Sequence, residues 1–291
     1  MTTETRVRSG SAARLRMTPA RTLTLAVGVP VLLALIGFTG FSVIADIGQA
    51  SFPVRDTIPV HDGQVTAQVN SGNITLRQVA AGPDAALTGT ATYSLIRSTV
   101  MVSGSAVNYS CPLPTGDCSL DAALAVPART GVSLSTFGGD VTVPRFAGGL
   151  LTLNTDGGNV TAGALAGPVS LTTGGGDVTA SALGGSLRAV SDGGNLTIQA
   201  MDSADASVQS GGGDVSLAYD AAPDSLQVQV NSDGGNITVV LPPGRYNLHI
   251  NGDGGSLNQS SAVVDDPSAA KSVVLDSGGG NITISESPGT P

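Results

Sequence analysis

Apolar and polar residues alternate along the second half of the chain in a motif that recurs about every eighteen residues. Two alternating segments flank a glycine pair, with the consensus φ-x-φ-x-[ST]-x-G-G-[DN]-φ-[TS]-φ, where φ is apolar. Alternation with period two is typical of a half-buried strand, and a glycine pair between two such segments indicates a tight turn. Each repeat therefore predicts a strand, a turn and a second strand. The eight copies are VSLSTFGGDVTV (132–143), LTLNTDGGNVTA (151–162), VSLTTGGGDVTA (169–180), LRAVSDGGNLTI (187–198), ASVQSGGGDVSL (206–217), VQVNSDGGNITV (228–239), LHINGDGGSLNQ (248–259) and VVLDSGGGNITI (273–284), and a shortened copy is VTAQVNSGNITL (65–76).

A further apolar residue follows the second strand of most repeats and recurs at about the repeat length. These residues are Phe146, Leu165, Leu183, Met201, Tyr219 and Leu241. The extra inward-facing column favours coils over the alternative fold, a meander of hairpins. Because one repeat cannot bury its apolar face alone, the strands are expected to stack in parallel, with like residues above like. The predicted fold is all-β, a parallel β-solenoid of β-helix or β-roll type with about nine rungs.

Three insertions lengthen the later repeats: AAPDS (221–225), LPPGR (241–245) and the segment 261–271. Insertions in a solenoid map to loops on one face. We therefore expect the three insertions to lie close together in space, and a binding surface is predicted at that place.

The positions around the glycine pair carry one carboxylate per turn through most of the array. In sequence order, the residue after the pair is Asp140, Asn159, Asp177, Asn195, Asp214, Asn236, Ser256 or Asn281, and the residue before it is Phe137, Asp156, Gly174, Asp192, Gly211, Asp233, Asp253 or Gly278. A column of Asp on rungs about 4.8 Å apart would bring like charges together, and the stagger avoids this. Asn side chains can also hydrogen-bond to one another when they stack, and Asp and Asn both favour turns. The Asp and Asn residues are therefore explained by structure alone, without a ligand. The complementarity ends at the last repeat.

The same carboxylates allow a second interpretation, a Ca²⁺ ion held between rungs by carboxylate and backbone oxygens. The candidates are Asp140, Asp156, Asp177, Asp192, Asp214 and Asp233. The calcium motif of parallel β-rolls, G-G-x-G-x-D-x-U-x, places its apolar residue two positions after Asp, whereas here Val follows Asp directly. We therefore expect the structural interpretation to hold, with no metal and no cofactor.

An uncharged segment over 22–45 predicts one transmembrane helix, because about 36 Å of helix crosses a hydrocarbon core of about 30 Å. Arginines before it place the N-terminus in the cytoplasm and the remainder outside. A cleaved signal peptide is the alternative, since Val43-Ile44-Ala45 resembles a cleavage site, although the apolar stretch is longer than usual for one. The predicted organisation is a basic cytoplasmic tail (1–21), the transmembrane helix (22–45), a linker (46–55), an extracytoplasmic solenoid (56–286) and a disordered tail (287–291).

The two cysteines, Cys111 and Cys118, lie in the segment CPLPTGDC. Outside the cytoplasm a disulfide that closes this loop is expected. The spacing is poor for a metal site, and redox chemistry favours CxxC. The loop belongs to an insertion over 77–126 that interrupts the array and is predicted to form a lateral hairpin or a cap.

Residues 46–291 carry eight basic and twenty-one acidic groups. This excess of negative charge makes nucleic acid an improbable partner. The chain has two histidines, His61 and His249, and it lacks the G-x-S-x-G, HExxH and P-loop motifs. The return segments are the stretches that lead from the second strand of one repeat to the first strand of the next, and several acidic residues recur in them: Asp202, Asp205, Asp220 and Asp224. These residues allow two interpretations, a glycan-active site or, as we expect, a solvated edge that opposes aggregation.

The motifs GGDVTV, GGGDVTA, DGGNLTI and GGGNITI make the chain similar to the DUF4097 family of bacterial adhesin-like β-strand repeat proteins. The resemblance covers about residues 56–286 and implies a β-solenoid at the cell surface, with no catalytic residue. The predicted function is a non-enzymatic binding or scaffold module of the bacterial cell envelope, anchored in the cell membrane by its N-terminal helix. Its expected partner is an envelope protein or glycan. The alternatives are an envelope glycan-active enzyme that uses the acidic return loops and a Ca²⁺-dependent binding module.

Overall fold

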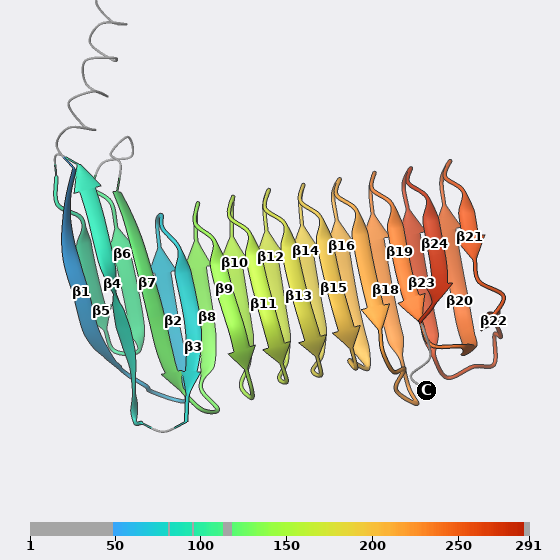
Figure 1. Cartoon of the computed structure of the whole chain (residues 1–291), viewed down its shortest axis with the longest axis horizontal. Helices are drawn as coiled ribbons and strands as arrows, with labels where there is room; N and C mark the ends of the chain where they lie inside the picture. Colours follow the sequence, from blue (N-terminus) through green and yellow to red (C-terminus); the bar gives the residue numbers. More distant parts are fainter. Residues whose placement is uncertain (1–48, 81, 95, 113–117, 288–291) are drawn as a thin grey trace, which may run out of the picture. The chain divides into compact units, whose positions relative to one another are not determined.

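The computed structural model describes residues 49–80, 82–94, 96–112 and 118–287, which form strands, turns and loops without a helix. The strands build two twelve-stranded sheets that face each other (Figure 1). In spatial order, sheet A contains β1 (Gln49–Pro59), β4 (Asp84–Ser94), β7 (Cys118–Pro127), β3 (Ile74–Val79), β9 (Val141–Phe146), β11 (Val160–Leu165), β13 (Val178–Leu183), β15 (Leu196–Met201), β17 (Val215–Tyr219), β19 (Ile237–Leu241), β24 (Ile282–Glu286) and β21 (Leu257–Gln259). Sheet B contains β22 (Val263–Asp265), β20 (Gly244–Gly252), β23 (Ser272–Ser277), β18 (Gln227–Ser232), β16 (Asp205–Ser210), β14 (Leu187–Ser191), β12 (Val169–Thr173), β10 (Leu151–Thr155), β8 (Gly131–Thr136), β2 (Gln64–Val69), β6 (Ala106–Ser110) and β5 (Thr99–Ser103).

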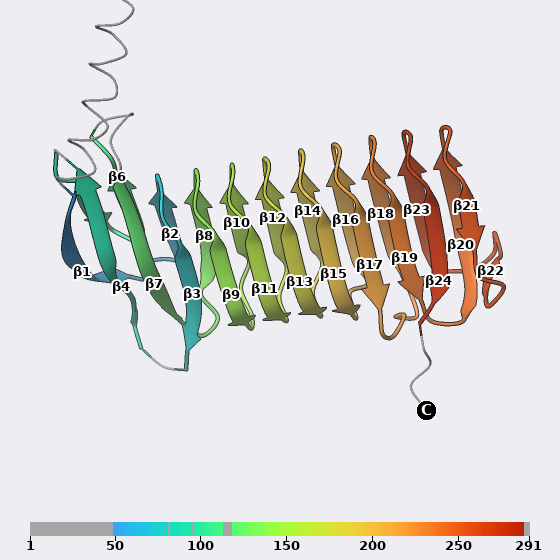
Figure 2. The same ribbon diagram turned by 45° about the horizontal axis from the view of Figure 1, so that its top comes forward.

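Each repeat gives its first strand to sheet B and its second strand to sheet A, so one repeat is one rung (Figure 2). Neighbouring rungs pair in parallel and in register, as Leu153 with Leu171 shows. The inward residues of both sheets meet between them and are almost completely buried. The predicted all-β parallel solenoid is therefore confirmed, and ten rungs are present in the described part of the chain.

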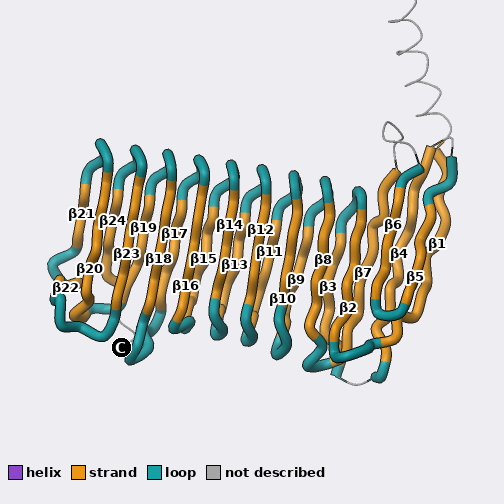
Figure 3. Tube along the Cα trace, turned by 180° about the vertical axis from the view of Figure 1, so that it is seen from behind, coloured by secondary structure: helices purple, strands orange, loops and turns teal. Residues whose placement is uncertain are grey.

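The third apolar column is also confirmed. Its members lie at the ends of the strands of sheet A and are at most 1% exposed: Phe146, Leu165, Leu183, Met201, Tyr219 and Leu241. The backbone pairs Leu165 with Phe146 on one side and with Leu183 on the other. From these strand ends the chain continues into the loops that lead to the next repeat (Figure 3).

The rungs do not follow sequence order at either end of the stack. The rung β2/β3 lies between β6/β7 and β8/β9, although β6 and β7 come later in the chain. The last repeat, β23/β24, lies between β18/β19 and β20/β21, so the penultimate repeat forms the final rung. The first repeat and the last repeat in the sequence thus each lie one rung inside the stack of repeats.

Strands β1 and β4 close one end of sheet A in antiparallel pairing, and β5 closes sheet B in the same way. The expected linker over 46–55 is wrong for residues 49–55, which belong to β1. Val54 and Ile58 of this strand lie in the core, and two buried positions among eleven residues give only a weak alternating pattern. Within the expected tail, Ser287 is still bound to the body, because its N–H donates to the carbonyl of Leu241.

The predicted cytoplasmic tail (1–21) and transmembrane helix (22–45) lie outside the described residues. Within the part of the chain that the structure describes, no helix has the length and apolar character needed to cross a membrane.

Candidate functional site

A continuous ladder of Asx side chains runs along the turn edge of the stack. In spatial order its members are Asp121, Asn73, Asp140, Asn159, Asp177, Asn195, Asp214, Asn236 and Asn281, and the ladder ends at Ser256. The Oδ1 atom of each Asx accepts the backbone N–H of the next member, at N···O distances of 2.7–3.0 Å. Asp and Asn alternate from Asp121 to Asn236, so no two carboxylates are neighbours in the ladder.

Buried hydroxyls lie behind this ladder and fix the turn. Thr155 Oγ1, for example, accepts the N–H of Gly158 at 3.0 Å. The second glycine of each pair packs against the neighbouring rung: a Cβ on Gly176 would collide with the carbonyl oxygen of Gly158, and the same collision recurs through the array. Glycine is required here by the close approach of two backbones.

The residue before the glycine pair forms a second column, and its order in space differs from its order in sequence. The spatial order is Phe137, Asp156, Gly174, Asp192, Gly211, Asp233, Gly278 and Asp253. Asp233 and Asp253 follow each other in the sequence, but Gly278 separates them in the stack. The alternation within this column therefore continues to the final rung, whereas the rung of Gly278 and Asn281 still carries no carboxylate at either position.

The six calcium candidates are exposed and divide between these two columns. Asp140, Asp177 and Asp214 belong to the ladder, where their Oδ1 atoms already accept hydrogen bonds. Ca²⁺ needs six to eight oxygen ligands at about 2.3–2.6 Å. Across the described residues, His, Cys, Asp and Glu side chains do not gather in groups of three or more that could hold a metal ion.

In the rung β6/β7, a disulfide loop takes the place of the glycine turn. Cys111 and Cys118 are joined, with their Cα atoms 6.1 Å apart. Cys111 directly follows β6, and Cys118 begins β7. The insertion over 77–126 thus contributes a full rung and strands β4 and β5, which extend the two sheets at this end.

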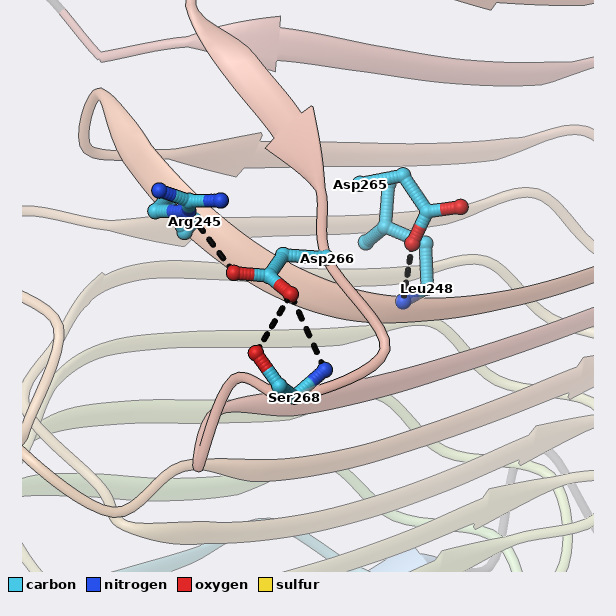
Figure 4. A network of polar contacts seen from close by, with 5 residues as sticks. All are labelled: Arg245, Leu248, Asp265, Asp266 and Ser268. Carbon is cyan, nitrogen blue, oxygen red and sulfur yellow. Dashed lines mark hydrogen bonds and ion pairs between the residues drawn. The ribbon is translucent and has the colours of Figure 1, made fainter.

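The three insertions approach one another at the return edge, opposite the turns. Gly244 N–H donates to the carbonyl of Ala262, and Ser272 N–H donates to the carbonyl of Leu226, which directly follows AAPDS. Figure 4 shows that Asp266 accepts both the hydroxyl and the N–H of Ser268 and forms an ion pair with Arg245 at 2.7 Å. The hydrogen bonds from Ser268 lower the pKa of Asp266, with a smaller contribution from Arg245.

A cleft of about 240 Å³ lies beside these insertions on sheet B. Its lining is formed by Leu187, Asp205, Ala206, Ser207, Gln227, Val228, Gln229, Ser272 and Val274. Asp205, Gln227 and Ser272 form one row across β16, β18 and β23, and Ser207, Gln229 and Val274 form the next. Hydroxyl and amide groups beside apolar surface can hydrogen-bond a polar, uncharged ligand. Sequence reasoning singled out Asp205 but missed the Ser and Gln residues, because single Ser and Gln residues on a strand resemble an ordinary solvated face.

The acidic residues of the return segments do not share one groove. Asp205 lines the cleft on sheet B, whereas Asp202 lines a different cleft, of about 370 Å³, beside Phe146 and Leu165. Behind Asp205 the hydroxyl of Tyr219 is buried, and burial raises the pKa of this phenol, with a smaller contribution from Asp205. The separation of Asp202 from Asp205 favours the solvated-edge interpretation for these two residues.

Solved structures that are similar to this chain include the following two. One is described as a "putative adhesin" from Bacteroides fragilis, with 17% identity, a TM-score of 0.45, and coverage of 80% of this chain and 97% of that chain. The other is described as a "putative cell adhesion protein" from Clostridium sporogenes, with 12% identity, a TM-score of 0.27, and coverage of 81% and 100%. Among curated proteins, no sequence matches this chain. The family model named Toastrack DUF4097 matches residues 54–285, and the chain belongs to that family.

Proposed function

We propose that this protein is a membrane-anchored, extracytoplasmic, adhesin-like binding module of the bacterial cell envelope, without enzymatic activity, and that its partner is an envelope glycan. The cleft on sheet B carries the proposal. Glycans are bound through their hydroxyl groups, and Ser207, Gln227, Gln229 and Ser272 offer matching donors and acceptors there.

The stack supports this role because it holds the polar groups rigidly. Gln229 and Ser207 are paired in register on neighbouring parallel strands, and the inward residues Val208, Val228 and Val230 beside them are buried. A ligand that contacts a preformed site loses less free energy to ordering than one that must organise a mobile loop. Two of the insertions end close to the cleft, because Gln227 and Ser272 of its lining closely follow AAPDS and the segment 261–271 in the chain.

Isothermal titration with soluble peptidoglycan fragments and purified wall polysaccharides tests the proposal. Gln229→Ala is expected to weaken binding about fivefold, the equivalent of one hydrogen bond of about 1 kcal/mol. Gln199→Ala is the matched control, because Gln199 is also exposed but lies on β15 of sheet A. Absence of glycan binding, or equal binding by both variants, would reject the proposal that the cleft binds a glycan. Capture of an envelope protein through Gln229 would show that the partner is a protein.

The anchor is a separate part of the proposal and rests on the uncharged segment 22–45. The full chain should remain in the membrane pellet after alkaline extraction, and protease added to spheroplasts should digest the body while sparing residues 1–21. A chain released by alkali, or a body protected from protease, would contradict this topology.

A further inference from the structure

The stack ends at the rung formed by β20 and β21, whose outer side is largely open (Figure 1). β21 is the last strand of sheet A, and β22 pairs with β20 only along 244–246, with one further contact from the Asp265 carboxylate, which accepts the N–H of Leu248. Asn247 and Asp253 donate their N–H groups toward the inner neighbours, to the carbonyls of Lys271 and Ser277. Because N–H groups point alternately to the two sides of a strand, those of Ile250 and Gly252 face outward.

The same rung exposes part of the apolar core. Leu257 is 54% exposed, whereas its in-register neighbour Ile282 is 2% exposed. Leu248 and Ile250 are partly buried, while Val273 and Leu275, which pair with them, are fully buried. The final rung therefore leaves unburied the surface that another rung covers everywhere in the middle of the stack.

This open rung is nearly uncharged in an acidic protein. Residues 247–259, NLHINGDGGSLNQ, contain one acidic residue, Asp253, and no Lys or Arg, whereas the whole chain has a formal charge of −9. The opposite end carries Arg55 and Arg97, and edge strand β1 contains Pro53 and Pro59. Charged residues and Pro on an edge strand oppose pairing with another chain, and the open rung has almost none of them.

We propose that the open C-terminal rung binds the same rung of a second copy of this chain, end to end. A matching partner must present two open strand edges, one sheet spacing apart, with apolar side chains between them and little charge. The open rung of a second copy has all of these features. A two-fold axis between the copies pairs β20 with β20 and β21 with β21 in antiparallel fashion. At the other end, edge strand β1 carries Arg55, Pro53 and Pro59, which oppose the same pairing, so the assembly stops at a dimer.

Sedimentation velocity of the full chain in detergent, over a range of concentrations, tests this assembly. Leu257→Lys places two cations at the interface and is expected to raise the dissociation constant of the dimer at least about tenfold. Met101→Lys is the matched control, because Met101 is 61% exposed on β5 at the opposite end. It should leave the dimer unchanged, and any association through the N-terminal segment is common to both variants.

Oxidation of single-cysteine additions identifies the end that pairs. Asn258→Cys on β21 should form a disulfide-linked dimer, whereas Ser103→Cys on β5 should not. A wild type that remains monomeric at all concentrations, filaments in place of dimers, or dimerisation that is lost with Met101→Lys and kept with Leu257→Lys would each overturn the proposal.

Discussion

The two ends of the stack are closed to very different extents. At the N-terminal end β1 and β4 add two antiparallel strands to sheet A, β5 adds one to sheet B, and a disulfide replaces the glycine turn. Arg97 also lies over the ring of Phe52, at 4.2 Å from its centroid. At the C-terminal end the segment 260–271 folds back, where it pairs with residues 244–246 of β20 and accepts the N–H of Leu248 through Asp265.

This difference shows what the repeat itself can and cannot supply. A rung in the middle has its backbone paired and its apolar residues covered on both sides, so the repeat is sufficient there. A rung at an end has one neighbour, and the missing contacts must come from other structure or remain open. Contacts that every rung shares should therefore matter most in the middle and least at the open end.

The largest expected effect is at the close approach of two turns. In Gly213→Ala the new Cβ collides with the carbonyl of Gly194, which we expect to cost about 3–4 kcal/mol in the free energy of unfolding. Gly255→Ala meets Gly280 in the same way, but the final rung can move outward, so about 1 kcal/mol is expected. Urea denaturation measures both.

Gly212→Ala is the control for this pair, since no atom lies within 4 Å of its added Cβ. It should change stability by less than about 1 kcal/mol. Equal losses for Gly213→Ala and Gly255→Ala would mean that the final rung is held as firmly as the middle.

Removal of an inward leucine gives the next largest effect. Leu275 is fully buried in β23, and Leu275→Ala should cost about 3 kcal/mol through lost burial and the cavity that remains. Leu257→Ala, on the neighbouring open rung, should cost less than about 1 kcal/mol in the monomer because Leu257 is already half exposed. A similar loss at both positions, measured by urea denaturation at low protein concentration, would show that the final rung is covered.

Removal of the disulfide tests how strongly it stabilises the closed end. Replacing both Cys111 and Cys118 by Ala opens a loop of about eight residues, for which loop-closure entropy predicts a loss of about 2.5 kcal/mol. The loss should appear in the rung β6/β7 first, as faster amide exchange of Tyr109 and Leu120 with little change at Val178. Uniform faster exchange along the stack would indicate that the closed end and the middle unfold together.

The sequence was sufficient for the middle of this fold and insufficient for its ends. Alternation and the glycine pair predicted the strands, the turns and the buried third column, because every middle rung repeats the same contacts. The order of the end rungs could not be read from a local pattern, although one residue carried a signal. The succession Asp233, Asp253, Gly278 breaks the alternation in sequence, and placing Gly278 between the two Asp residues restores it. The Ser and Gln residues of the cleft on sheet B gave no signal, since the cleft arises from residues on four strands, β14, β16, β18 and β23, that are far apart in the chain.

The smallest expected effect tests charge in the Asx ladder. Asn195 lies between Asp177 and Asp214, whereas Asn281 lies between Asn236 and Ser256. Both Asn195→Asp and Asn281→Asp lose an Nδ2 donor, but only Asn195→Asp adds a carboxylate next to two others. We expect Asn195→Asp to lower the free energy of unfolding by about 1.5 kcal/mol at pH 7, and Asn281→Asp, among neutral neighbours, to lower it by about 0.5 kcal/mol.

The pH dependence separates repulsion from the lost hydrogen bond. Neighbouring carboxylates should raise the pKa of the introduced Asp in the folded state above its unfolded value of about 3.9. An acid with a raised folded pKa loses stability as the pH rises through the unfolded value and up to the folded one, so the excess cost of Asn195→Asp should vanish below about pH 3.5. Thermal unfolding at pH 3.5 and pH 7 measures this excess. If it persists at the lower pH, the alternation of Asp and Asn serves hydrogen bonding alone, and charge relief does not explain why the pattern is kept through the middle of the stack.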